Sequence, residues 1–307
     1  MNGEPVTPPV PRRRGPSQGQ LMIRRALALG LLVAVVAAVG WVGTMAIGAT
    51  GEEAAPPPPT TTAPPPPKPL KIIFPEGFTR RDMADRITAV NRIARKTRKI
   101  KPKLAEREYL RLTQRSRLPG EFAGDGKRRH LEGFLFPATY EFLGTTTTKQ
   151  LVNKQLLAFN RSWAKLDLAY ARSKNLTAYD VLIIASMVEK ETLAPEERPL
   201  VAAVIYNRLR LRMPLGIDAT IRYGLNVPGT ESLRQSHLES DTPYNTRKYA
   251  GLPPTPIANP GLASMQAAAH PAKVDYLYFV RKPDKKHHFF TASESEFLNY
   301  PRDGLNC

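Results

Sequence analysis

The chain has 307 residues, a formal net charge of +18 and a single cysteine, Cys307, at its end. One cysteine excludes an intrachain disulfide and a thiolate metal site, and the five histidines show no metal-ligating spacing. We therefore expect no metal and no cofactor. The length allows about two domains, but the first seventy residues do not have a globular composition.

Residues 1–25 contain clustered arginines, and residues 26–50 form an uncharged apolar run that is long enough to cross a bilayer as one helix. Because the arginines precede the run and Glu52 and Glu53 follow it, we expect a cytoplasmic basic tail and a single transmembrane helix. The expected location is the cell inner (cytoplasmic) membrane, with the catalytic domain extracytoplasmic. A cleaved signal peptide is the alternative, and the small residues near Ala49 are weak evidence for it.

Residues 51–69 consist mainly of Pro, Thr and Ala. Such a segment cannot bury a core and is expected to extend as polyproline II, at about 3.1 Å per residue. We interpret it as a Pro-rich linker that holds the later domains away from the membrane. A Pro-rich ligand for a binding module is the alternative interpretation.

Residues 70–125 are predicted to form a small subdomain. Leu70–Phe74 indicates a strand, Thr79 caps a helix that ends at about Arg95, and a second helix covers about 104–114. Residues 71–120 hold fifteen Lys or Arg against five Asp or Glu, a net charge of +10. Outside a membrane this charge favours anionic lipid head groups or acidic wall polymers over nucleic acid. A solvated helical face explains it equally well.

The pattern of residues 126–300 predicts one mixed domain, so the expected fold class is α+β. We predict helices from the apolar spacing and one antiparallel strand pair from the aromatic runs. The helices are expected at Lys149–Ala171, Ala178–Glu191, Glu196–Arg210, from Asp218 to about Gly224, and at Ser264–His270; the strands are expected at Tyr276–Val280 and His288–Thr291.

The predicted helix 178–191 carries two glutamates at its end. At about 100° per residue, its apolar side chains centre on Ile184 and Val188, and Glu191 lies about 30° from that centre. Glu189 lies about 130° away. A carboxyl on the buried face has a raised pKa and can exchange a proton near neutral pH. A frayed turn with two solvated glutamates is the alternative.

Ten short motifs in one order, over about residues 71–298, resemble the endolytic murein transglycosylase family, also called YceG-like. They are the segments 74–77, 132–137, 184–192, 204–209, 218–224, 243–246, 251–254, 257–261, 267–271 and 276–280. Each is weak alone, but together they are specific to this family.

The resemblance implies a membrane-anchored lytic transglycosylase with a LysM-like subdomain before its YceG-like catalytic domain. Such an enzyme cleaves the MurNAc–GlcNAc bond inside nascent peptidoglycan strands, leaves a 1,6-anhydroMurNAc end and limits strand length. Its expected partners are peptidoglycan glycan strands, the cell membrane and peptidoglycan synthases (penicillin-binding proteins), with no nucleic acid. The family's acid/base glutamate maps to Glu191.

The remaining candidates are polar residues within or close to the matching segments that are suited to binding sugar hydroxyls and acetamido groups. They are Glu132, Asp218, Tyr244, Asn245, Asn259 and His288. Asp218 is alternatively a helix N-cap, Glu132 a solvated loop carboxylate, and each of the others a turn-stabilising residue.

Two other activities stay open on the sequence. One is a hydrolytic muramidase that uses Glu191 and Asp218 as its two carboxylates. The other is a non-catalytic cell-wall-binding scaffold that recruits synthases.

Overall fold

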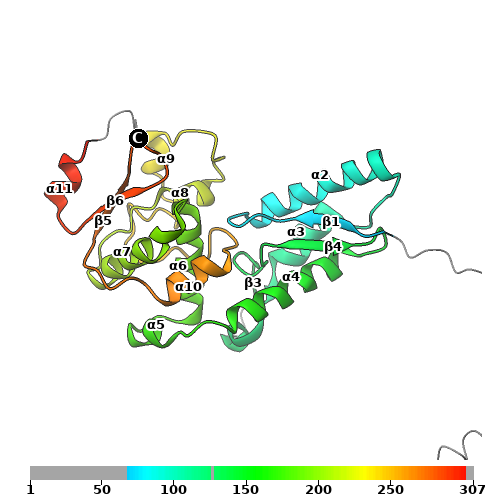
Figure 1. The fold of residues 1–307 in the computed structure, drawn as a ribbon, viewed down its shortest axis with the longest axis horizontal. Helices are drawn as coiled ribbons and strands as arrows, with labels where there is room; N and C mark the ends of the chain where they lie inside the picture. The colour runs from blue at the N-terminus through cyan, green and yellow to red at the C-terminus, as the bar shows by residue number, and fades with distance from the viewer. Residues whose placement is uncertain (1–67, 126–127, 302–307) are drawn as a thin grey trace, which may run out of the picture. The chain divides into compact units, whose positions relative to one another are not determined.

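The computed structural model describes residues 68–125 and 128–301 (Figure 1), which belong to one compact unit, Pro66–Cys307. The predicted basic tail, transmembrane helix and nearly all of the Pro-rich linker lie outside the described residues. Within the described residues, no helix has both the length and the apolar character needed to cross a bilayer.

The N-terminal part begins with strand β1 (Leu70–Ile73) and helix α2 (Arg80–Arg98). The predicted cap is confirmed, because the Thr79 hydroxyl accepts from the backbone N–H of Asp82 while the Asp82 carboxylate accepts from that of Thr79. Helix α3 (Glu106–Gln114) follows, and strand β4 (Thr139–Phe142) returns antiparallel to β1. Strand β4 was not predicted, although its side chains alternate between exposed and buried positions.

The chain continues through two short strands, a 3₁₀ turn and two helices. Strands β2 (Ser116–Arg117) and β3 (Arg128–Arg129) pair around a 3₁₀ turn, Gly120–Asp125. Helices α4 (Thr148–Trp163) and α5 (Ala169–Ser173) replace the single helix predicted over 149–171. That prediction was wrong because the chain turns after Trp163, and the Asp167 carboxylate accepts from the Ala169 N–H to start α5.

Helix α6 (Ala178–Glu191) lies among the C-terminal elements, and its predicted bounds are confirmed. It contacts α7 (Arg198–Arg210), which continues a 3₁₀ turn at Pro195–Glu197, together with α8 (Asp218–Leu225) and α10 (Leu262–Ala269). The remaining elements are α9 (Gln235–Leu238), the antiparallel strands β5 (Tyr278–Arg281) and β6 (His288–Thr291), and α11 (Glu294–Asn299). The predicted strand pair is thus confirmed, and the fold is mixed α+β.

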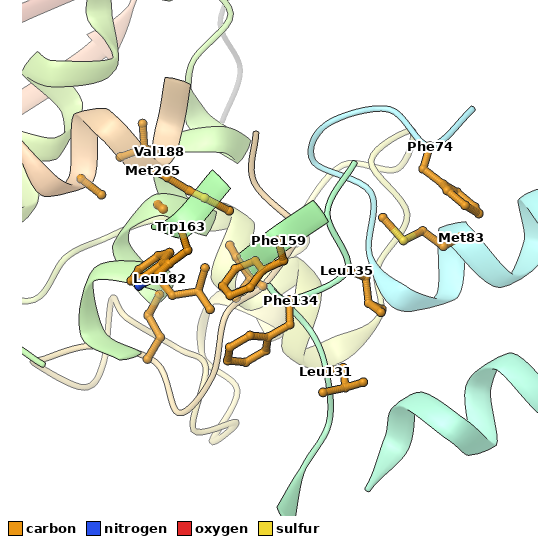
Figure 2. Packing of buried hydrophobic residues seen from close by; sticks show 14 of the residues in the cluster. Phe74, Met83, Leu131, Phe134, Leu135, Phe159, Trp163, Leu182, Val188 and Met265 are labelled. Carbon is orange, nitrogen blue, oxygen red and sulfur yellow. The ribbon is translucent and has the colours of Figure 1, made fainter. Parts of the chain in front are cut away.

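One continuous apolar core joins these elements (Figure 2). The rings of Phe134 and Phe159 meet edge-to-face at 5.0 Å, and Leu182 and Val188 of α6 belong to the same cluster. All eight residues from Val181 to Val188 are buried, so α6 is covered on every side rather than along one apolar stripe. This packing holds the C-terminal turn of α6 in a fixed position.

Candidate active site

Glu191 is the last residue of α6, and its carboxyl has an unusual environment for an ionisable group. Its pKa is raised to about 7, mainly by burial and also by the nearby charge of Asp218. Arg281, a hydrogen bond from the Ala219 backbone N–H and Lys190 act in the opposite direction. A carboxyl with this pKa is partly protonated at neutral pH and can both give and take a proton.

Glu189 lies two residues before Glu191 on α6 and points about 160° away from it around the helix, and it has a different partner. Its Oε2 accepts from the backbone N–H of Gly261 at 2.9 Å, at the start of α10. Gly261 also lies against the carboxyl of Glu76, where a Cβ atom would collide. Burial and the charge of Glu189 raise the pKa of Glu76. Glu189 therefore holds the N-terminus of α10, which favours a negative charge.

Asp218 occupies the first position of α8, directly after the N-cap residue Ile217. It is therefore not the N-cap that one interpretation of the sequence suggested. The Arg247 guanidinium Nε donates to Asp218 Oδ1 at 2.6 Å. This ion pair orients the carboxylate at the same helix end that donates an N–H to Glu191.

Glu197 and His288 form a buried pair that is linked to Glu191 through Arg281. The Glu197 carboxylate accepts from the His288 backbone N–H at 2.8 Å, and its Oε2 lies 2.7 Å from His288 Nδ1. His288 is opposite Arg281 in the β5–β6 ladder, and Arg281 Nη2 donates to the backbone carbonyl of Glu191 at 3.3 Å. Burial lowers the pKa of His288, although Glu197 raises it. The His288 imidazole therefore anchors β6, and β6 pairs with the strand that carries Arg281.

Glu132 and Asn259 lie in a second buried cluster. The Glu132 carboxylate accepts from the Arg80 backbone N–H at 2.9 Å, from Asn259 Nδ2 at 2.8 Å and from the Tyr223 hydroxyl at 3.1 Å. Asn259 Oδ1 accepts from the N–H of Gly133 at 2.9 Å. Glu132 is only 2% exposed, so it is not the solvated carboxylate that the sequence left open, and it ties α2, α8 and the 257–261 segment together.

Tyr244 and Asn245 belong to the loop after α9. Asn245 is fully buried, and its Nδ2 donates to the carbonyls of Leu238 and Ser240 at 2.8 and 2.9 Å, which matches a turn-stabilising residue. Tyr244 is half-buried; its hydroxyl lies 2.8 Å from Thr255 Oγ1 and its ring packs against Tyr223 at 5.2 Å.

The structure thus divides the predicted residues into groups. Asp218 lies beside Glu191, and His288 reaches it through Arg281. Glu132, Asn259 and Tyr244 are joined around Tyr223 in the second cluster. Two arginines beside the first group, Arg247 and Arg281, were not singled out in the sequence. Each comes directly after a matching segment, 243–246 or 276–280, and that position was the signal available in the sequence.

Among residues 68–125 and 128–301, no group of three or more His, Cys, Asp or Glu side chains is placed to hold a metal ion. The chemistry that the first group can perform is proton transfer by a partly buried carboxyl with a raised pKa, which is the class of site found in carboxylate-dependent enzymes acting on glycosidic bonds.

The chain belongs to the YceG-like family, whose model matches residues 61–302. Over 152 residues it is 40% identical to the endolytic murein transglycosylase of Bacillus subtilis (strain 168), which covers 50% of this chain and 42% of that protein. The endolytic murein transglycosylase of Streptococcus pneumoniae (strain ATCC BAA-255 / R6) is 41% identical over 162 residues, covering 50% and 29%. The matches therefore span less than half of these curated relatives.

A solved structure has a similar fold. It is a crystal structure at 2.6 Å of a putative yceG-like protein from Listeria monocytogenes, with a TM-score of 0.60 and 32% sequence identity. The likeness covers 74% of this chain and 75% of that chain.

Proposed function

We propose that this protein is an endolytic peptidoglycan lytic transglycosylase with Glu191 as its acid/base residue. The observation that carries the proposal is the Glu191 carboxyl, whose pKa of about 7 arises from burial beside Asp218. Membership of the YceG-like family and the similarity to two endolytic murein transglycosylases support the substrate class.

In the proposed reaction, protonated Glu191 gives its proton to the glycosidic oxygen between MurNAc and GlcNAc as the bond from C1 to that oxygen breaks. The resulting carboxylate takes the proton from the MurNAc 6-hydroxyl, whose oxygen forms the new bond to C1. The products are a free GlcNAc hydroxyl and a 1,6-anhydroMurNAc end. One carboxyl suffices because the nucleophile belongs to the substrate.

The environment of Glu191 suits both steps. Burial and Asp218 favour the protonated form, so the acid is available near pH 7. Arg281 and the Ala219 N–H favour the carboxylate that forms after the first proton transfer. A carboxylate that is too strongly stabilised would not take the proton from the 6-hydroxyl. The opposing effects of burial and Asp218 on one side and of Arg281 and the Ala219 N–H on the other leave the pKa of Glu191 close to neutral.

The hydrolytic alternative has one observation in its favour, which is the proximity of Asp218 to Glu191. A hydrolase would use Asp218 to activate water or to form a covalent intermediate. The ion pair with Arg247 argues against this role, because the guanidinium Nε already occupies Asp218 Oδ1 at 2.6 Å.

The experiment is mass spectrometry of the products formed from uncrosslinked glycan strands. Wild type should leave 1,6-anhydroMurNAc ends, Glu191→Gln should lose cleavage, and Glu189→Gln should retain it. Reducing ends without anhydro products would establish the hydrolase instead. Loss of activity in Glu189→Gln alone would refute the assignment of Glu191. Absence of any cleavage by the wild type, with Glu191→Gln keeping full function in cells, would favour the non-catalytic scaffold.

The cellular setting is also a proposal. The apolar run at 26–50, preceded by arginines, supports a single-pass inner-membrane anchor with the N-terminus cytoplasmic. The Pro-rich segment at 51–69 supports an extended spacer, and residues 70–125 a LysM-like subdomain. Limitation of nascent strand length beside penicillin-binding proteins follows from this setting. Crosslinking of the full chain to the synthases in cells would test the partnership, which absence of any crosslink above background would exclude.

A further inference from the structure

The C-terminal half of α2 and the start of α3 enclose an open groove of about 600 Å³. Asn91, Arg92, Arg95 and Lys96 of α2 form one wall, and Glu106 of α3 belongs to the other. A second hollow of about 330 Å³ adjoins it, because Arg95 lines both. None of these residues takes part in the site around Glu191.

The charge of the groove is strongly positive. Arg92, Arg95 and Lys96 are exposed, and no ion pair within the described part of the chain neutralises them. Glu106 is the acidic residue of the lining, and its carboxylate accepts from the Thr88 hydroxyl at 2.6 Å. The adjoining hollow adds Lys99 and Lys101 and no acidic residue. The groove therefore favours an anionic ligand.

Asn91 gives the groove a second requirement. The side chain is 8% exposed, and its Nδ2 donates to the carbonyl of Leu104 at 2.7 Å, which fixes the orientation of the amide. Asn91 Oδ1 has no hydrogen-bond partner. A buried acceptor without a donor is unfavourable. If the lining side chains move apart, a ligand hydroxyl can reach Asn91 Oδ1 and donate the missing hydrogen bond.

The position of the groove in the chain indicates where such a ligand would come from. Arg98, one turn beyond the groove, donates from Nη1 to the carbonyl of Pro69 at 3.1 Å. The basic end of α2 therefore lies beside the start of β1 (Figure 1), which directly follows the Pro-rich segment in the sequence. Ile93 is 59% exposed and projects about 60° from Lys96 around the helix. An apolar side chain among cations is typical of a surface that meets a membrane interface.

We propose that this groove binds the glycerol phosphate head group of an anionic membrane phospholipid, with Arg92, Arg95 and Lys96 on the phosphate and Asn91 Oδ1 accepting from a glycerol hydroxyl. Guanidinium groups match phosphate oxygens in geometry. Neighbouring anionic head groups of the same lipid surface would attract Lys99 and Lys101. The contact would hold the subdomain flat against the membrane from which the linker emerges. The proposal rests on the membrane anchor proposed above and not on the cleavage reaction.

The test uses the full chain in nanodiscs of phosphatidylcholine with and without phosphatidylglycerol, and measures the acetylation rate of Lys96 by mass spectrometry. Lys165, exposed just beyond α4, is the internal control. Phosphatidylglycerol should slow acetylation of Lys96 by roughly fivefold or more, which is the effect of one basic residue at a lipid surface. Lys165 should be unaffected. Equal rates at Lys96 in both nanodiscs, or equal slowing at Lys165, would overturn the proposal.

Variants identify the contacts. The double variant Arg92→Gln, Arg95→Gln should remove the protection of Lys96, whereas the matched double variant Lys149→Gln, Arg161→Gln, at two exposed positions on α4, should keep it. Persistence of the protection in the first variant would overturn the groove as the binding site.

Two further comparisons, one with another lipid head group and one with a soluble polymer, distinguish recognition of the glycerol phosphate from attraction to negative charge alone. Phosphatidic acid, which lacks the glycerol head group, should protect Lys96 less than phosphatidylglycerol does at equal surface charge, and Asn91→Leu should abolish that difference. Equal protection by both lipids in the wild type would overturn the contact with Asn91. Protection by a soluble glycerol phosphate polymer in phosphatidylcholine nanodiscs, without protection by phosphatidylglycerol, would overturn the lipid as ligand. None of these outcomes depends on whether the protein cleaves glycan.

Discussion

Replacing Glu132 by Gln should make the stability of this protein less dependent on pH. Burial raises the pKa of the Glu132 carboxyl from 4.5 to about 7, although Arg80 and the Tyr223 hydroxyl lower it. A carboxyl with a raised pKa binds its proton more tightly in the folded chain than in the unfolded chain. Its contribution to stability is therefore complete below about pH 4.5 and is lost as the pH rises through 7.

The size of the effect follows from the pKa difference. A rise of about 2.5 pH units corresponds to roughly 3 kcal/mol of folding free energy. Gln has the same shape and no charge, and its side-chain oxygen can still accept from the N–H of Arg80 and from Asn259 Nδ2. We expect Glu132→Gln to be at least as stable as wild type at pH 8, with the advantage disappearing near pH 5.

The assay is urea unfolding of the full chain in a neutral detergent at pH 5 and pH 8, followed by tryptophan fluorescence. Because Glu191 also has a raised pKa, the informative quantity is the difference between wild type and variant at each pH. Glu141→Gln, which changes an exposed strand carboxylate paired with Lys71, is the matched control and should not alter the pH dependence. An unchanged pH dependence in Glu132→Gln would refute the reasoning that this carboxyl resists ionisation.

Four further substitutions have expected outcomes. Asp218→Asn removes a charge that raises the pKa of the Glu191 carboxyl, so the alkaline limb of the pH–rate profile of strand cleavage should move to lower pH. Arg281→Gln removes a charge that lowers this pKa and should move the limb to higher pH. Shifts of the opposite sign would contradict the electrostatic account. His288→Ala leaves a buried carboxylate without its partner and should cost roughly 3 kcal/mol in urea unfolding at pH 8, where a loss below 1 kcal/mol would argue against the pair. Thr177→Ala removes the capping box of α6 and should cost about 1 kcal/mol in the same measurement, without changing the pH–rate profile.

The sequence was most informative where the local signal and the packing agree. The apolar run from Val181 to Val188 predicted α6 with its observed bounds, and the projection separated Glu191 from Glu189 in direction. The sequence did not reveal the partner of Glu189, because the N–H of Gly261 that it accepts from lies 72 residues away along the chain. Contacts at that separation depend on the fold and leave no trace in local periodicity.

Glu132 illustrates the same limit. The sequence suggested a sugar-binding residue or a solvated loop carboxylate, and both interpretations assumed that this carboxylate stays near water. The structure instead surrounds it with donors from three separate segments, through Arg80, Tyr223 and Asn259. A buried carboxylate of this kind can be predicted only once its donors are known to converge.

The pairing of β1 with β4 also has a consequence during synthesis. Leu70 is opposite Phe142, so the first strand to leave the ribosome cannot pair until about seventy more residues have been made. At roughly 5–20 residues per second this delay lasts several seconds. Through that interval Ile72, which is fully buried in the finished protein, has no partner strand to cover it. Helices α2 and α3, whose hydrogen bonds are local, are available first and can shield it until the second strand arrives.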